Sequence, residues 1–144
     1  MVIKKNFKLG VCLFFLSQSS SLFSKNCEGP SENWTNCYSK QTLDDGSYYE
    51  GNFKDGLRHG KGKVTWTNGD LYMGNWKRGF RHGKGKYIWE EGESYDGEWK
   101  EGLQNGQGKS TLTNGDTFIA NYIEGKMTGK EFKTPSTKIV SVSH

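Results

Sequence analysis

The sequence predicts an all-β protein, a twisted single-layer ribbon of antiparallel β-hairpin repeats, preceded by an export signal. Aromatic residues and glycines recur together at a period of 23 residues, which is typical of a repeat architecture. Only 32% of the 144 residues are hydrophobic, too few for a thick core packed on all sides. Yet 14% are aromatic, which argues against disorder. These observations indicate short strands with many turns, and they leave little room for a catalytic domain of ordinary size.

Residues 1–24 have the three parts of a secretory signal peptide. Lys4, Lys5 and Lys8 form a basic start, residues 9–16 are apolar, and small polar residues lead to Ser24. A membrane anchor would need a longer span, because residues 9–16 cover only about 12 Å of the roughly 30 Å of hydrocarbon. We therefore expect export to the periplasm, the cell surface or the extracellular space, with cleavage near Ser21 or Ser24.

Removal of this segment changes the charge balance and the cysteine count. Three of the 20 Lys and Arg residues leave with it and none of the 16 Asp and Glu residues, so 17 basic residues remain against 16 acidic ones. We therefore expect no nucleic-acid binding, which usually shows a strongly basic domain. Cys12 also leaves, and an oxidising compartment favours a disulfide between the remaining Cys27 and Cys37. Two free thiols, or half of a metal site, are the alternatives.

The repeats occupy residues 49–132, with units at 49–71, 72–94 and 95–117 and a partial unit at 118–132. The full units begin at a tyrosine and the partial unit begins at Phe118. The residues expected to define the fold are the recurring aromatic residues and glycines, namely Tyr49, Gly51, Phe53, Gly60, Gly62, Tyr72, Gly74, Trp76, Gly83, Gly85, Tyr95, Gly97, Trp99, Gly106 and Gly108.

Each unit is predicted to be a β-hairpin, because its residues alternate with the period of a strand that has one polar face. Asp55-Gly56 and Asn68-Gly69 suit tight hairpin turns. A helix is excluded, since about five glycines per unit would each cost near 1 kcal/mol. About eight strands would then make a ribbon near 40 Å long.

The strand glycines are predicted to lie beneath aromatic rings. Gly51, Gly60 and Gly62 have the same strand parity as Tyr49, Phe53 and Trp66. Glycine weakens a strand unless something must approach the backbone closely. We therefore expect the rings to lie flat across the glycines of neighbouring strands.

The two ends of the ribbon are expected to be atypical. Residues 25–48 are predicted to be a cap that holds the disulfide and a divergent first repeat, in which Trp34 falls at the Leu57 position and Leu43 at the Trp66 position. The partial unit has Ala120 in place of a glycine. Residues 133–144 are predicted to be a flexible tail, in which 138–142 could add a short strand.

No enzyme, metal site or cofactor is predicted. Gly108-Lys109-Ser110 resembles the end of a phosphate-binding loop, but the required earlier glycine is absent and the segment lies in a hairpin. His59 and His82 are equivalent repeat positions without further ligands at metal-binding spacing. Asn33-Trp34-Thr35 is a glycosylation sequon, which has meaning only in a eukaryote.

The basic residues of the first two units are candidates for binding an anionic surface such as acidic lipid, polysaccharide or protein. They are Arg58, Lys61, Lys63, Lys77, Arg78, Arg81, Lys84 and Lys86. Within this set Lys61, Lys63, Lys84 and Lys86 share a strand parity opposite to that of the glycines, so they should project together. The alternative is an ordinary solvated face.

The unit closely resembles the MORN repeat, with three good copies over 49–117 and weaker units over roughly 37–132. Tyr49-Glu50-Gly51, Lys54-Asp55-Gly56 and the run 58–62 carry this resemblance. It implies a hairpin ribbon that acts as a scaffold or interaction module, sometimes on acidic phospholipids and sometimes by self-association, here through the ribbon edges. We therefore expect an exported, non-enzymatic scaffold that binds a protein partner or an anionic membrane surface. The alternative is a cell-wall or glycan-binding module that uses exposed aromatic residues.

Overall fold

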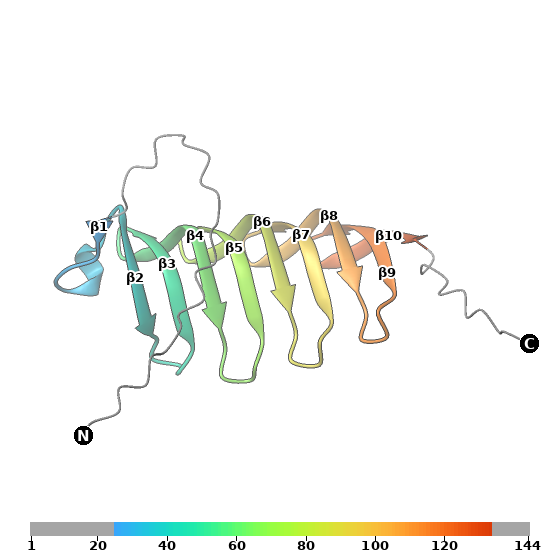
Figure 1. The fold of residues 1–144 in the computed structure, drawn as a ribbon. Coiled ribbons are helices and arrows are strands. Elements are labelled where there is room, and N and C mark those ends of the chain that lie inside the picture. The colour runs from blue at the N-terminus through green and yellow to red at the C-terminus, as the bar shows by residue number, and fades with distance from the viewer. Residues whose placement is uncertain (1–24, 134–144) are drawn as a thin grey trace, which may run out of the picture.

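The computed structural model describes residues 25–133, so the predicted signal peptide and the tail from residue 134 onward lie outside the described residues. The described chain forms one ten-stranded sheet in which the strands lie side by side in chain order (Figure 1). A 3-10 turn, η1 (Ser31–Asn33), connects the first two strands. The strands are β1 (Lys25–Asn26), β2 (Cys37–Thr42), β3 (Tyr48–Lys54), β4 (Leu57–Thr65), β5 (Leu71–Lys77), β6 (Phe80–Ile88), β7 (Ser94–Lys100), β8 (Leu103–Thr111), β9 (Thr117–Ile123) and β10 (Lys126–Lys133).

The four repeat units supply eight strands, β3 to β10, each paired antiparallel with the next. The cap adds β2, which pairs antiparallel with β3, and β1, which pairs parallel with β2 through Lys25↔Cys37 and Asn26↔Tyr38. The sequence did not predict β1, because a two-residue strand has no periodicity to detect. β10 also extends to Lys133, one residue beyond the predicted repeat boundary.

The turns within the units are the tight turns that were predicted. Asp55 and Gly56 both have positive φ, 53° and 71°, which is the type I′ conformation that suits the twist of a hairpin. The same pair of positive φ values recurs at Arg78-Gly79, Glu101-Gly102 and Glu124-Gly125.

The turns between units are longer than predicted. Gly69 N donates to Trp66 O at 3.0 Å and Trp66 N donates to Asp70 O at 2.9 Å. Gly69 has a φ of 93°, in the left-handed region, whereas Asn68 does not have a positive φ. The connection is therefore a three-residue loop, a type I turn followed by a left-handed glycine, and not a two-residue turn.

The predicted contact between tyrosine rings and strand glycines is present in each full unit. A Cβ atom added at Gly62 would come within 2.7 Å of Tyr49 Cζ, and one added at Gly51 would come within 2.5 Å of the same side chain's hydroxyl. Gly51 and Gly62 are direct cross-strand partners. The equivalent groups are Tyr72 with Gly74 and Gly85, and Tyr95 with Gly97 and Gly108.

Gly60 was wrongly grouped with these glycines. It has a φ of 68°, and an added Cβ would meet the Asn52 side chain at 3.5 Å, with no aromatic ring among its near neighbours. The register passes from Gly51↔Gly62 to Phe53↔Arg58, so Asn52 lies opposite three residues of β4. Gly60 thus serves a β-bulge that needs a left-handed residue. Gly83 and Gly106 occupy the equivalent bulges.

The core lies on one face of the sheet, which we call the aromatic face. Figure 1 shows the strands curling over along one side of the ribbon, so that the sheet forms a trough. Tyr49, Tyr72 and Tyr95 have no exposed surface. Each packs edge-on against an aromatic residue of the next unit: Tyr49 on Trp76, Tyr72 on Trp99 and Tyr95 on Tyr122, with centroids 5.6, 5.4 and 5.2 Å apart. Each unit therefore completes the core of its neighbour, as in other one-dimensional repeat proteins.

Candidate interaction surfaces

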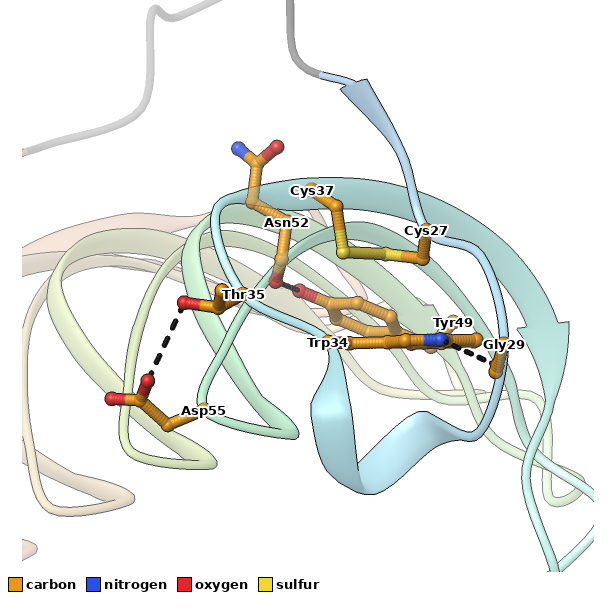
Figure 2. Close-up of a disulfide and its surroundings, with 8 residues drawn as sticks. All are labelled: Cys27, Gly29, Trp34, Thr35, Cys37, Tyr49, Asn52 and Asp55. Atoms are coloured by element: carbon orange, nitrogen blue, oxygen red, sulfur yellow. Dashed lines mark hydrogen bonds between the residues drawn. A yellow bond between two sulfur atoms is a disulfide. The ribbon is translucent and has the colours of Figure 1, made fainter.

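The cap closes the first edge of the ribbon (Figure 2). The predicted disulfide joins Cys27 and Cys37, whose Cα atoms are 5.0 Å apart. Cys37 pairs with Phe53 as Gly60 pairs with Trp76, so the cap continues the register of the repeats. Trp34 packs edge-on against Phe53 at 5.0 Å, and its indole Nε1 donates to Gly29 O at 2.9 Å. The cap thus replaces the missing first strand of its unit and covers the start of the core.

The predicted basic set divides between the two faces of the sheet. Arg58 pairs with Phe53 and Arg81 pairs with Trp76, so both arginines lie on the aromatic face. They do not share a surface with the predicted lysines. Lys77, the last residue of β5, and Arg78, in the turn that follows, are both exposed.

The two arginines stack on the aromatic rings of the following unit. The guanidinium carbon of Arg58 lies 4.4 Å from the Trp76 ring centroid, and that of Arg81 lies 4.6 Å from that of Trp99. Arg58 Nη2 donates to Gly79 O at 3.2 Å, and Arg81 Nη2 donates to Gly102 O at 2.6 Å.

Burial lowers the pKa of both arginines, but an arginine side chain stays charged in proteins. The structure therefore holds two fixed cations inside the trough. The sequence analysis did not place the arginines on the aromatic face. Arg58 is separated from Gly60 and Gly62 by an even number of residues, and this spacing would have indicated that all three share a face.

The aromatic face contains the same cavity twice. The first, of about 310 Å³, is lined by Leu43, Phe53, Gly56, Leu57 and Arg58 among others. The second, of about 260 Å³, has at the equivalent positions, 23 residues further on, Trp66, Trp76, Gly79, Phe80 and Arg81. Leu43 and Arg58 line both cavities, so the two are neighbours along the ribbon.

The opposite face of the sheet carries Lys61, Lys63, Lys84 and Lys86 together, as predicted, and we call it the lysine face. Lys63 is paired with Glu50 and Met73, and Lys86 is paired with Met73 and Asp96. Lys84 Nζ makes an ion pair with Glu98 Oε1 at 2.8 Å.

Lysines predominate on this face along β2 to β8. The alternation of the strands places nine lysines and three acidic residues there, namely Lys40, Lys54, Lys61, Lys63, Lys77, Lys84, Lys86, Lys100 and Lys109 against Glu50, Asp96 and Glu98. Hydrogen bonds from Tyr38 and Lys40 lower the pKa of the Glu50 carboxyl, which stays ionised and forms an ion pair with Lys40.

A family model for the MORN repeat matches residues 49–71, 72–94 and 95–117. These three units are MORN repeats. Their bounds are the predicted ones, and each unit spans one of the hairpins β3–β4, β5–β6 and β7–β8. MORN repeats in general mediate interactions with proteins or with membrane lipids. A search of curated proteins found no match to the chain.

Residues 25–133 include no group of three or more His, Cys, Asp or Glu side chains that could hold a metal ion. No helix in this part of the chain is long and apolar enough to cross a membrane.

Proposed function

We propose that this MORN protein is an exported, non-enzymatic scaffold that attaches to an anionic surface through its lysine face. The observation that carries the proposal is the segregation of charge. Nine lysines share one face with three acidic residues, although the chain without residues 1–24 is nearly neutral. A face with such an excess attracts acidic lipid headgroups or an acidic polysaccharide, each lysine contributing about 1 kcal/mol near an acidic membrane.

The repeat geometry makes this face a regular array. Lys61 and Lys84 occupy equivalent positions one hairpin apart, as do Lys63 and Lys86. Two strand spacings separate equivalent positions, so the lysines recur about every 10 Å along the ribbon. Because the ribbon is long and one-sided, several lysines can contact one extended surface together while the aromatic face remains accessible to a protein partner.

The test is co-sedimentation of the full chain with acidic and with neutral phosphatidylcholine vesicles. Changing Lys61, Lys63, Lys84 and Lys86 to Gln should abolish binding to acidic vesicles, and changing the same four residues to Arg should preserve it. Binding should also fall steeply with salt, as the Debye length shrinks from about 10 Å at 0.1 M to about 3 Å at 1 M. Equal binding by the wild type and the Gln variant, or no binding by either, would leave this face as ordinary solvated surface.

Two further arms of that experiment separate the related functions. Capture by an acidic polysaccharide but not by vesicles would identify the anionic surface as glycan. Capture by neutral cell-wall glycan, unchanged in the Gln variant, would favour the alternative of a glycan-binding module that uses aromatic residues.

A further inference from the structure

We propose that the hairpin tips of the repeats insert shallowly into an acidic lipid bilayer, so that the anionic surface bound by the lysine face is a membrane. This inference rests on the proposed function, and it names the kind of surface and the side chains that enter it. The tips are the turns between β3 and β4, β5 and β6, β7 and β8, and β9 and β10. Since neighbouring strands are antiparallel and lie in chain order, all four tips are on one edge of the sheet.

Each tip exposes one large apolar side chain beside a lysine. The residues that flank the turn are cross-strand partners, and in every unit they are a lysine and an apolar residue. The pairs are Lys54↔Leu57, Lys77↔Phe80, Lys100↔Leu103 and, in the reverse order, Ile123↔Lys126. The apolar members are 47%, 56%, 49% and 61% exposed, and they are four of the seven exposed large hydrophobic residues in the described part of the chain. We call these four pairs the tip row.

The apolar side chains of the tip row follow one another along the ribbon. Neighbouring tips are two strand spacings apart, which is about 9.6 Å. Phe80 Cδ1 lies 3.7 Å from the position of a Cβ added to Gly102, and Leu103 Cδ2 lies 3.6 Å from one added to Gly125. Each of these side chains therefore reaches the turn of the next unit. Cross-strand partners share a face of the sheet, so the tip row is the margin of the lysine face.

A lysine paired with an apolar side chain suits the boundary between lipid headgroups and acyl chains. The Cβ atoms of cross-strand partners are about 5 Å apart, so the lysine stem can lie along its partner. The apolar side chain then enters the outer hydrocarbon layer while the ammonium group reaches the phosphates, as lysines do at membrane interfaces. An acidic polysaccharide has no apolar layer to receive Leu57, Leu103 and Ile123. The tip row therefore favours a membrane over a glycan.

A hollow between the first two tips fits a lipid phosphate. It has a volume of about 340 Å³ and is lined by Lys54, Asp55, Leu57, His59, Lys77 and Arg78. The Lys and Arg side chains place three cations against one carboxylate, and Asp55 Oδ1 already accepts a hydrogen bond from Thr35 Oγ1 at 3.4 Å. Leu57 offers apolar surface in the same hollow to the acyl chain that the phosphate carries.

Acidic residues limit the attraction at the other tips. Glu32 of the cap lies beside the first turn, and Glu101 and Glu124 lie in the third and fourth turns. The nine lysines of the lysine face therefore supply the attraction, and the tip row supplies the insertion. The second tip has Lys77 and Arg78 and no acidic residue, so we expect Phe80 to insert most deeply.

The chain itself supplies a matched control. In unit four the apolar residue precedes the turn and the lysine follows it, whereas the other units have the opposite order. The exchange variant Lys77→Phe/Phe80→Lys copies the order of unit four and keeps both the charge and the apolar surface. The threonine variant Leu57→Thr/Phe80→Thr/Leu103→Thr keeps every charge and removes apolar surface, with a residue that suits strands.

The experiment is co-sedimentation of the full chain with vesicles of equal parts phosphatidylcholine and phosphatidylglycerol, together with the change in surface pressure of a monolayer of the same lipids. The wild type and the exchange variant should bind the vesicles and raise the surface pressure. The threonine variant should partition at least tenfold more weakly, because membrane binding scales with buried apolar area, and it should leave the surface pressure nearly unchanged. An acidic polysaccharide should capture the wild type and the threonine variant equally.

Several results would overturn the insertion and leave the attachment of the lysine face standing. They are equal partitioning of the threonine variant, vesicle binding by the wild type without a rise in surface pressure, and capture of the wild type by the polysaccharide but not by vesicles. Loss of partitioning in the exchange variant, with its near-UV circular dichroism retained, would do the same.

Two other results have a different meaning. Failure of the wild type to bind either anionic surface would refute the proposed function itself. A dimer of the wild type in sedimentation velocity without lipid, absent in the threonine variant, would assign the tip row to contact between two copies of the chain and refute insertion.

Discussion

Replacing Gly85 with alanine should destabilise the ribbon strongly, because the space for a methyl group is already filled. An added Cβ would lie 2.5 Å from Tyr72 Cζ. The Tyr72 ring has no exposed surface, and it is held between Trp76 and Trp99 at 5.2 and 5.4 Å. Its hydroxyl also donates to Asn75 O at 2.9 Å. The ring cannot yield without disturbing both indole contacts and this hydrogen bond.

The magnitude follows from these contacts. Overpacking a well-packed site costs typically 1–3 kcal/mol, and loss of the tyrosine hydrogen bond adds about 1 kcal/mol. We expect a total of about 2–4 kcal/mol. At about 4 °C or more per kcal/mol for a domain of this size, the melting temperature should fall by at least 8 °C.

The assay is thermal and urea unfolding, followed by circular dichroism under non-reducing conditions. Gly129→Ala is the matched control, because Gly129 also lies in a strand, lacks a positive φ, and has no heavy atom within 4 Å of an added Cβ. That variant should unfold within about 0.5 kcal/mol of the wild type. If Gly85→Ala were equally mild, the tyrosine would not depend on a bare backbone beneath it, and the explanation for the strand glycines would be wrong.

Two further predictions concern cleavage of the signal peptide and the response of stability to pH. Intact-mass measurement of the protein recovered from cells should show loss of about 21 to 24 residues, as signal-peptide cleavage requires; a soluble cytoplasmic product that keeps residues 1–16 would refute export. Burial raises the pKa of Tyr87 and of Tyr95 to about 12 and also raises the pKa of Tyr49 and Tyr72. These folded-state pKa values lie above the unfolded value near 10. The contribution of each tyrosine to the free energy of unfolding is therefore fully present below pH 10. It is lost as pH rises toward 12, by up to about 1.4 kcal/mol per tyrosine per pH unit. Tyrosinate absorbance and circular dichroism should change together in one cooperative transition, and gradual tyrosine ionisation near pH 10 with an intact far-UV spectrum would contradict this.

The sequence was sufficient for the repeat, the hairpins and the glycine–tyrosine contact, because each depends on local periodicity. Tyr49, Gly51 and Gly62 could be placed together by parity alone. Gly60 could not be distinguished from them, since its parity is the same and its positive φ comes from a bulge that only the pairing of β3 with β4 defines. β1 could not be predicted for a related reason. Its parallel pairing with β2 lies beside the disulfide between Cys27 and Cys37 and is not visible in local sequence.

The candidate surfaces were predicted less well, because neighbours in sequence were treated as neighbours in space. Arg58, Lys61 and Lys63 form one basic run, but strand alternation sends the arginine to the aromatic face and the lysines to the opposite face. The cavities beside Arg58 and Arg81 are formed by two consecutive units, so no single unit of the sequence displays them. Only the superposition of Leu43 on Trp66 and of Leu57 on Phe80, at the same period, would have indicated that the two cavities are equivalent.

The third unit shows which residues the hairpin needs and which it does not. There Gln104, Asn105 and Gln107 replace Arg81, His82 and Lys84, yet β7 and β8 pair with the register of β5 and β6, including Gly97↔Gly108 and Trp99↔Gln104. The hairpin therefore depends on its glycines and rings, and it does not require arginine at this position. What Arg58 and Arg81 add is contact between units, because each guanidinium stacks on the indole of the following unit and donates to a turn carbonyl there. Gln104 takes the same strand position without a cation, so the charge distinguishes the first two units and is not a condition for the hairpin.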